Sequence, residues 1–103
     1  MQKVLVMYEL KKGVTVEKYK DWLINVEMKV TPTLPGIHNF EVVEIKGSEG
    51  EVKTCTIIED FTVDSYQVWQ KAVASEAMKD VAAAWARYGD ESTLKIFYGE
   101  IIE

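Results

Sequence analysis

The chain has 103 residues, of which 48% are hydrophobic and 28% are charged, and this composition is typical of one folded globular domain spanning residues 1–103. Seventeen acidic against twelve basic residues give a net charge of −5, which argues against nucleic acid as a partner. No apolar run reaches the roughly 18 residues of a membrane-spanning helix, and the N-terminus lacks a signal-peptide pattern, so we expect a cytoplasmic protein without membrane contacts. A single cysteine and a single histidine exclude an internal disulfide and a Cys/His zinc set.

The opening third of the chain predicts a strand and a helix. From Lys3 to Leu10 apolar residues occupy both alternating sets of positions, which indicates a strand covered on both faces. Thr15 is a favourable N-cap, so we expect a helix that begins near Val16 and ends at Pro32. Its apolar stripe, with Trp22 on the flank, consists of Val16, Tyr19, Leu23, Val26 and Val30.

Two further strands follow the proline. Phe40 to Lys46 and Val52 to Phe61 are expected to be antiparallel partners, joined by a hairpin at Gly47 to Gly50. Glu59 and Asp60 interrupt the second of these strands, and because neighbours on a strand point to opposite sides, one acid should face each side of the sheet. An acid directed inward is costly unless it is paired or functional.

The last part of the chain predicts an interrupted helical region and a closing strand. Asp64 is the expected N-cap of this region, and Gly89 is its expected C-cap. Two apolar stripes that do not continue in phase meet near Ser75, where a serine followed by an acid indicates a new helix start, so we expect a break there. Thr93 to Ile102 then closes the sheet and is again apolar at both sets of positions.

The resulting order of elements, β-α-β-β-α-β, predicts an α+β ferredoxin-like fold with a four-stranded antiparallel sheet. Two helices can cover only one face of such a sheet, whereas three of the strands carry bulky apolar residues on both faces. Burying roughly 500 Å² of apolar surface contributes on the order of 12 kcal/mol before the costs of association. We therefore expect a homodimer that packs sheet against sheet. The alternative is that loops and the C-terminal strand cover the second face.

Four short motifs carry a resemblance to a known superfamily. They are Tyr19-x-x-Trp22, Leu34-Pro35-Gly36, Ser75-Glu76-Ala77-Met78 and Asp90-Glu91-Ser92. With them the chain resembles the dimeric α/β-barrel superfamily, in which two ferredoxin-like subunits pack their sheets into a barrel. Within it the chain is similar to the RedY-like subgroup, associated with prodiginine biosynthesis, and to EthD-like proteins. The superfamily contains cofactor-free monooxygenases, polyketide cyclases and haem proteins, so the resemblance implies a dimer and secondary metabolism but supplies no reaction.

Two residues are candidates for acid–base catalysis. Glu27 lies on the shoulder of the first helical stripe, where it can reach a cavity between helix and sheet, and burial there would raise its pKa. The alternative is a solvated carboxylate that pairs with Lys20 or Lys29. His38 follows the Pro-Gly turn and is either a general base or a surface histidine at a strand end. Some EthD-like relatives place a histidine roughly where Glu27 stands, so the resemblance does not bring a histidine-dependent mechanism to this chain.

Aromatic residues are candidates for the walls of a ligand site. Tyrosine hydroxyls can donate hydrogen bonds to a ligand carbonyl, and indoles can flank a flat ligand, although core packing accounts for the same residues. The candidate substrate-binding residues are Tyr8, Trp22, Phe40, Trp69, Trp85 and Tyr98. The only histidine lies at a strand start and not within a helix, so we expect neither haem nor any other cofactor, and no metal.

The leading functional hypothesis is a protein that holds a small, mostly apolar molecule, aromatic or polyketide-like, between sheet and helices. It either binds this molecule or turns it over without a cofactor, with Glu27 or His38 as acid or base and Tyr8 or Tyr98 as hydrogen-bond donors. The alternative is a non-catalytic ligand-binding or assembly module. A cavity above roughly 300 Å³ with convergent polar groups favours the first hypothesis, and a filled core favours the second.

Overall fold

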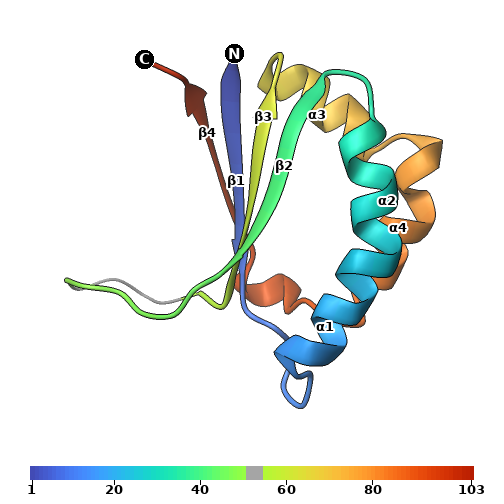
Figure 1. Cartoon of the computed structure of the whole chain (residues 1–103), viewed down its shortest axis with the longest axis vertical. Coiled ribbons are helices and arrows are strands. Elements are labelled where there is room, and N and C mark those ends of the chain that lie inside the picture. Colours follow the sequence, from blue (N-terminus) through green and yellow to red (C-terminus); the bar gives the residue numbers. More distant parts are fainter. Residues whose placement is uncertain (51–54) are drawn as a thin grey trace.

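A four-stranded antiparallel sheet with all helices on one face forms the protein (Figure 1), as seen in a computed structural model that describes residues 1–50 and 55–103. The strands are β1 (Gln2–Tyr8), β2 (Ile37–Glu44), β3 (Ile57–Val63) and β4 (Lys95–Glu100). They lie in the order β2-β3-β1-β4, so β1 and β3 are central. The predicted ferredoxin-like fold is confirmed. Within the described ranges no helix is long and apolar enough to cross a bilayer.

The strands differ from their predicted bounds at the sheet ends. β2 begins at Ile37, earlier than expected, with a register irregularity between Ile37 and Asn39 where it joins β3. β4 ends at Glu100, so Ile101 and Ile102 lie beyond it. A short 3-10 turn, η4 (Glu91–Thr93), precedes β4. The predicted hairpin connection, Gly47 to Gly50, lies in a longer segment between the end of β2 and the start of β3. The first residues of the predicted strand Val52 to Phe61 fall on residues 51–54, which lie outside the described residues.

The first helical region is one continuous rod made of different kinds of helical turn. It begins with α1 (Val16–Trp22), widens into a π-helical turn, η1 (Leu23–Glu27), and continues as α2 (Met28–Val30). Thr15 caps it as predicted, because its Oγ1 accepts a hydrogen bond of 3.2 Å from the backbone N–H of Lys18. Pro32 lies in the 3-10 turn that ends the region, η2 (Thr31–Thr33).

The π turn changes which residues face the sheet. Val26, placed on the predicted apolar stripe, is 37% exposed, whereas Glu27 is only 4% exposed. In an α-helix, residues four apart drift around the axis by about 40° at each step, and a wider turn cancels this drift. The residues that stay in line and are buried are therefore spaced by four: Tyr19, Leu23, Glu27 and Thr31. The prediction for Val26 was wrong because periodicity alone assumes a uniform helix.

The second helical region is broken where the sequence predicted a break. It consists of α3 (Tyr66–Val73), a 3-10 turn η3 (Glu76–Met78) and α4 (Lys79–Trp85), with Ser75 between the first two. The N-cap is Ser65 and not Asp64, because the Ser65 hydroxyl accepts from the backbone N–H of Val68 at 3.2 Å. Asp64 instead binds a histidine, as described below.

Gly89 does not directly end α4, contrary to the prediction. The helix stops at Trp85, and the N–H of Gly89 donates to the carbonyl oxygen of Trp85 at 2.9 Å. A Cβ atom on Gly89 would lie 2.2 Å from the Trp85 indole ring, far inside van der Waals contact. A glycine is needed at this position because the indole packs against its backbone.

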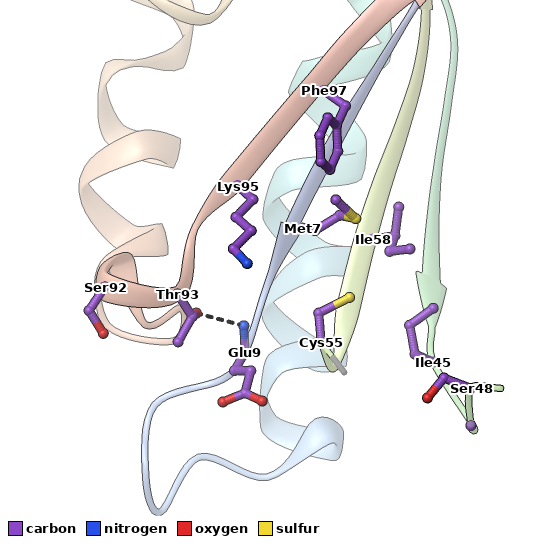
Figure 2. Close-up of a pocket in the computed structure, with 11 residues that line it drawn as sticks. Met7, Glu9, Ile45, Ser48, Cys55, Ile58, Ser92, Thr93, Lys95 and Phe97 are labelled. Atoms are coloured by element: carbon purple, nitrogen blue, oxygen red, sulfur yellow. Dashed lines mark hydrogen bonds between the residues drawn. The ribbon is translucent and has the colours of Figure 1, made fainter. Parts of the chain in front are cut away.

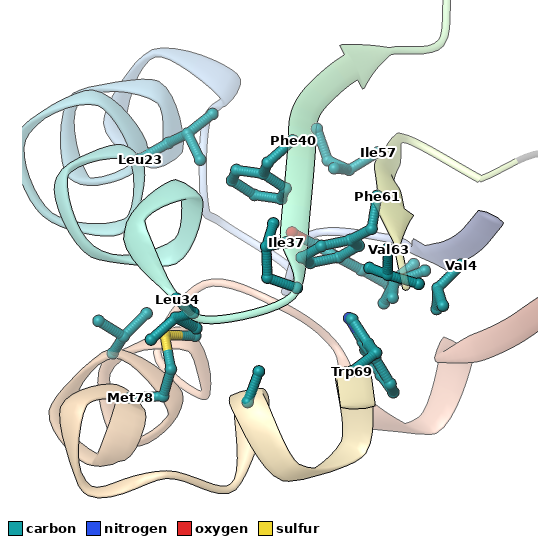
Figure 3. Close-up of a cluster of buried hydrophobic side chains, with 14 of the residues drawn as sticks. Val4, Leu23, Leu34, Ile37, Phe40, Ile57, Phe61, Val63, Trp69 and Met78 are labelled. Carbon is teal, nitrogen blue, oxygen red and sulfur yellow. The ribbon is translucent and has the colours of Figure 1, made fainter. Parts of the chain in front are cut away.

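The hydrophobic core lies between the sheet and the helices (Figure 3). Alternate residues of β1 and β3 point into it, among them Val4 and Tyr8 from β1 and Ile57 and Phe61 from β3. Leu23 and Met78 meet them from the helical layer. Period-two alternation in the strands thus selects one face of the sheet for the helices.

The other face of the sheet, which we call the open face, carries no helix (Figure 1). Its apolar side chains include Val43, which is 43% exposed, and Phe97, which is 59% exposed. Lys3 and Asp60 form an ion pair of 2.9 Å on this face. The predicted apolar character of both faces is confirmed.

Candidate functional site

A cavity of about 240 Å³ lies between the sheet and the second helical region, and we call it the inner cavity. Its walls are mostly apolar and come from the sheet, from the end of the first helical region and from the second helical region. The lining residues are Val6, Glu27, Thr31, Glu59, Phe61, Trp69, Val73, Met78, Val81, Ala82, Trp85, Leu94 and Ile96. The exposed members are Ala82 of α4 and Ile96 of β4, so the cavity opens between these two elements.

Glu27 reaches the inner cavity from the last position of the π turn. Its side chain is buried, and its Oε1 atom has no hydrogen-bond partner among the described residues. Burial, and to a smaller extent repulsion from Glu59, raises the pKa of Glu27 from 4.5 to about 9. The carboxyl group is therefore protonated at neutral pH, and it does not form the predicted alternative, a solvated pair with a lysine.

Glu59 reaches the same cavity from β3, where it shares the inward face with Ile57 and Phe61. Its Oε2 accepts a hydrogen bond of 2.5 Å from the hydroxyl of Tyr8. Burial raises the pKa of Glu59 from 4.5 to about 7, against the opposing effect of this hydrogen bond. Two carboxyl groups thus face one apolar space, the arrangement in which one proton is held in preference to two charges.

Two tyrosines form a hydrogen-bonded chain behind Glu59. The hydroxyls of Tyr8 and Tyr19 are 2.6 Å apart. A phenol carries one hydrogen, and Tyr8 donates its hydrogen to Glu59, so Tyr19 donates to Tyr8. Burial raises the pKa of both tyrosines, so they remain neutral donors. The chain links α1, β1 and β3 and fixes the position of the Glu59 carboxyl group.

Two of the predicted tryptophans line the inner cavity, and one does not. Trp69 and Trp85 are both in its wall, and the Nε1 of Trp69 is buried without a partner among the described residues. Trp85 packs edge-on against Tyr8 with ring centroids 5.0 Å apart. Trp22 is buried outside the cavity lining and stacks on Tyr88.

Three other predicted residues lie away from the inner cavity. His38 is exposed on β2, and its Nε2 lies 2.5 Å from Oδ1 of Asp64. Phe40 packs on Phe61 within the core, at a centroid distance of 4.7 Å. Tyr98 is 60% exposed and stacks on a tyrosine at the start of α3. The structure therefore does not bring Glu27 and His38 to one pocket.

Glu59 was missing from the set of candidate site residues. The sequence contains a signal for it, because Glu59 shares one face of the strand with Ile57, Phe61 and Val63, and these three residues are apolar. The prediction that Glu59 and Asp60 face opposite sides is confirmed: Glu59 is buried on the helical side, and Asp60 pairs with Lys3 on the open face.

A second hollow, of about 570 Å³, lies on the open face, and we call it the outer hollow (Figure 2). Side chains of Met7, Ile58 and Phe97 border it from the strands, with Cys55 and Lys95 beside them. At its lower edge the backbone N–H of Glu9 donates to Oγ1 of Thr93 at 2.9 Å. Within the described ranges no group of three or more His, Cys, Asp or Glu side chains is placed to hold a metal ion, in this hollow or elsewhere.

Solved structures of several proteins share this fold. HapK from Hahella chejuensis has a TM-score of 0.80 at 14% identity, with 99% of this chain and 93% of that chain covered. A hydroxynitrile lyase from Passiflora edulis has a TM-score of 0.75 at 13% identity, with coverage of 99% and 94%. A dimeric ferredoxin-like protein of unknown function from Thermobifida fusca has a TM-score of 0.74 at 10% identity, with coverage of 97% and 90%.

The sequence itself gives a more specific result than these structural similarities. No significant match is found among curated proteins. A family model described as REDY-like protein HapK, however, matches residues 2–101, which is nearly the whole chain. The resemblance to the RedY-like subgroup of dimeric α/β barrels is thereby confirmed, and the chain belongs to the REDY-like HapK family.

Proposed function

We propose that the protein binds a small, mostly apolar molecule in the inner cavity and that Glu27 and Glu59 move protons on this molecule without a cofactor. The observation that carries the proposal is the pair of buried carboxyl groups on one apolar cavity. Burying an ionisable group without a charged partner is costly, and apolar residues of similar volume would pack there at lower cost. Acids retained at such a site are candidates for function.

The size of the inner cavity limits the ligand. Its volume of about 240 Å³ lies just below the roughly 300 Å³ at which typical ligand pockets begin. An engineered cavity of about 150 Å³ is large enough to bind benzene. The inner cavity therefore suits a molecule with one ring and a few substituents, and it favours the smaller members of the predicted aromatic or polyketide-like class.

The two carboxyl groups suit acid–base chemistry near neutral pH. With a pKa of about 7, Glu59 is present in both ionisation states, and Glu27, with a pKa of about 9, holds its proton. Ionised Glu59 takes a proton from the ligand while neutral Glu27 gives one, as a tautomerisation requires, and the two acids then exchange a proton to restore their states. Tyr8 keeps the base in place through its hydrogen bond to Glu59.

We also propose that two copies of the chain pack through their open faces. Exposed apolar side chains such as Phe97 and Val43 support this arrangement, because water contact with them is unfavourable. The Thermobifida fusca protein of the same fold is described as dimeric. A second candidate function is a non-catalytic assembly module. The open face supports it, because the outer hollow on that face is larger than the inner cavity.

The fold is compatible with either function. The hydroxynitrile lyase from Passiflora edulis, which has this fold, is an enzyme. At such low identity the similarity concerns the fold alone, so the catalytic proposal rests on the buried acids of this chain and not on that protein's reaction.

A thermal-shift screen of one-ring compounds tests the proposal. We expect some compounds to raise the melting temperature of the wild type and to lose this effect with Glu27→Gln, which keeps the shape but removes the acid. The stability of this variant should change little near pH 4.5 and should exceed that of the wild type at pH 7, where the acid is ionised in the unfolded chain but neutral in the folded protein. The matched control is Glu17→Gln, an exposed acid of the same helical region.

Two results would contradict the proposal. One is a screen in which no one-ring compound stabilises the wild type. The other is an equal response of wild type and Glu27→Gln to every compound that stabilises the wild type, which would place the ligands elsewhere. Loss of stability in Glu27→Gln by more than about 2 kcal/mol would assign Glu27 to a structural network instead.

A further inference from the structure

The ionisable side chains of the inner cavity are all of one kind. Among its described lining residues the titratable groups are Glu27 and Glu59, and the structure shows no lysine, arginine or histidine in this lining. Thr31 supplies the other polar side chain, and the rest of the wall is apolar, with the buried indole N–H of Trp69 as a further donor. The cavity therefore contains two acidic groups and no compensating positive charge among the residues described.

Glu27 also lacks a hydrogen-bond partner. Its Oε1 is buried and unpaired among the described residues, whereas Oε2 of Glu59 already accepts a hydrogen bond from Tyr8. A buried carboxyl oxygen without a partner loses the hydrogen bonds that water gives it, and a ligand that donates one restores them. The unpartnered atom identifies where the polar group of a ligand would lie.

We propose that the inner cavity selects one-ring molecules that carry a basic nitrogen, which binds Oε1 of Glu27, over neutral or anionic molecules of the same shape. The inference rests on the proposed function, because it names the class of ligand for the same cavity. An ammonium group donates to Glu27 and supplies the positive charge that the cavity lacks. A neutral hydroxyl supplies only the hydrogen bond, and an anion would be buried beside two acids without a partner.

The preference should depend on pH. The titratable groups near Glu27 are Glu59 from β3 and Tyr19 from α1, and the Tyr8 hydroxyl from β1 bridges these two. The elements α3, η3, α4 and β4 contribute only uncharged residues to the cavity wall. Both tyrosines stay neutral, so the acids alone titrate near neutral pH. An ammonium ion favours ionised Glu27 and releases its proton, so the affinity should rise between about pH 6 and about pH 8. In this complex an N–H of the ammonium group takes the place of neutral Glu27 as the proton donor. An alkyl ammonium keeps its own charge over this range, as lysine does.

Isothermal titration calorimetry with benzylamine, benzyl alcohol and benzoate tests the inference, because the three probes share a ring and differ in charge. For the wild type at about pH 8 we expect benzylamine to bind roughly tenfold or more tightly than benzyl alcohol, as is typical of a hydrogen bond to a charged group. Benzoate should bind more weakly than both. Repeating the benzylamine titration in two buffers of different ionisation enthalpy should reveal proton release.

Variants assign the preference to the acid. Glu27→Gln should reduce the affinity for benzylamine to that of benzyl alcohol and leave benzyl alcohol within about twofold, whereas Glu17→Gln should behave as the wild type. If Glu27→Gln does not fold, Glu59→Gln provides the second test, because removing the repulsion from Glu59 lowers the pKa of Glu27 and should shift the rise in benzylamine affinity to lower pH while sparing benzyl alcohol.

The outcomes separate the inference from the proposed function. Equal binding of benzylamine and benzyl alcohol, or tighter binding of benzoate, overturns the inference and leaves a ligand cavity in place. A benzylamine preference that survives in Glu27→Gln, or a pH dependence that Glu59→Gln leaves unshifted, also overturns it. If no probe binds at concentrations up to about 10 mM, where fragments of this size are expected to bind, the ligand cavity fails as well.

Discussion

Each face of the sheet borders a hollow, and the larger hollow is not the one that contains the buried acids. The outer hollow is the larger, at about 570 Å³, yet the inner cavity of about 240 Å³ contains the buried acids. Glu59 and Asp60 show the difference within two residues: one is buried in the wall of the inner cavity, and the other pairs with Lys3 on the open face. The removal of carboxyl groups from water, more than volume, locates the candidate chemistry in this molecule.

The pH dependence of stability is the largest expected effect of the inner acids. The folded pKa values of Glu27 and Glu59 are raised above 4.5, to about 9 and about 7, so the folded protein holds protons that the unfolded chain releases. Their contribution to stability is complete below about pH 4.5 and is lost as the pH rises through these values. Urea unfolding should show a decline on the order of several kcal/mol between about pH 5 and about pH 9.

The double variant Glu27→Gln, Glu59→Gln should flatten this profile, and Glu17→Gln should leave it unchanged. A stability that is constant or rises over the same pH range in the wild type would mean that the inner acids are solvated. The distinction between the two hollows would then disappear.

A charge on the open face tests the other half of the comparison. Phe97→Asp places a carboxylate among exposed apolar side chains that we propose to be buried between two copies, and it should weaken association by a hundredfold or more, roughly 3 kcal/mol. Sedimentation velocity at micromolar concentration should show a dimer for the wild type and a monomer for this variant. Ile24→Asp, a change at an exposed apolar residue of the helical layer, is the matched control. A monomeric wild type would refute the proposed interface.

Gly89→Ala tests how rigidly the wall of the inner cavity is held. Its new Cβ would lie 2.2 Å from the Trp85 indole, which must move, and Trp85 lines the cavity. We expect a loss of about 1–3 kcal/mol in unfolding free energy, as is typical of overpacking, together with a change in indole fluorescence. Alanine at Gly13, where a Cβ would meet no atom, controls for the loss of glycine, although the positive φ of 87° there adds strain. Unchanged stability in Gly89→Ala would mean that the indole moves freely.

Tyr8→Phe should have the smallest effect, and it acts on one inner acid alone. The hydrogen bond from Tyr8 lowers the pKa of Glu59 against the effect of burial, so its loss should raise that pKa further above about 7. An NMR titration of the side-chain carboxyl of Glu59 measures the shift directly, and the cost in stability should be about 1 kcal/mol. Tyr66→Phe, at the first residue of α3 and outside this chain of hydroxyls, is the control. An unchanged Glu59 titration in Tyr8→Phe would contradict the proposed chain.

The sequence was sufficient for the fold because its patterns are local. Short apolar runs marked the strands, Thr15 marked a helix start, and the serine before an acid at Ser75 marked the break between α3 and η3. Each of these signals depends on hydrogen bonds or burial within a few residues. The N-cap at Ser65 was misassigned to its neighbour because both residue types cap helices and only tertiary contacts chose between them.

The candidate site was less predictable because it depends on contacts between distant segments. Glu27 and Glu59 lie on different elements, and no spacing in the sequence shows that they share a cavity. His38 had the residue type of a general base, yet it pairs with Asp64 at the surface. Trp22, Trp69 and Trp85 look alike in the sequence, and only packing distinguishes the two that line the cavity.

Because of the π turn at Leu23–Glu27, the orientation of Glu27 depends on the backbone conformation as well as on the residue type. A π turn closes with one more residue than an α turn. If the same residues closed as a uniform α-helix instead, every later side chain of that rod would rotate by several tens of degrees relative to the earlier ones. Glu27 would then leave the cavity although the residue itself is unchanged.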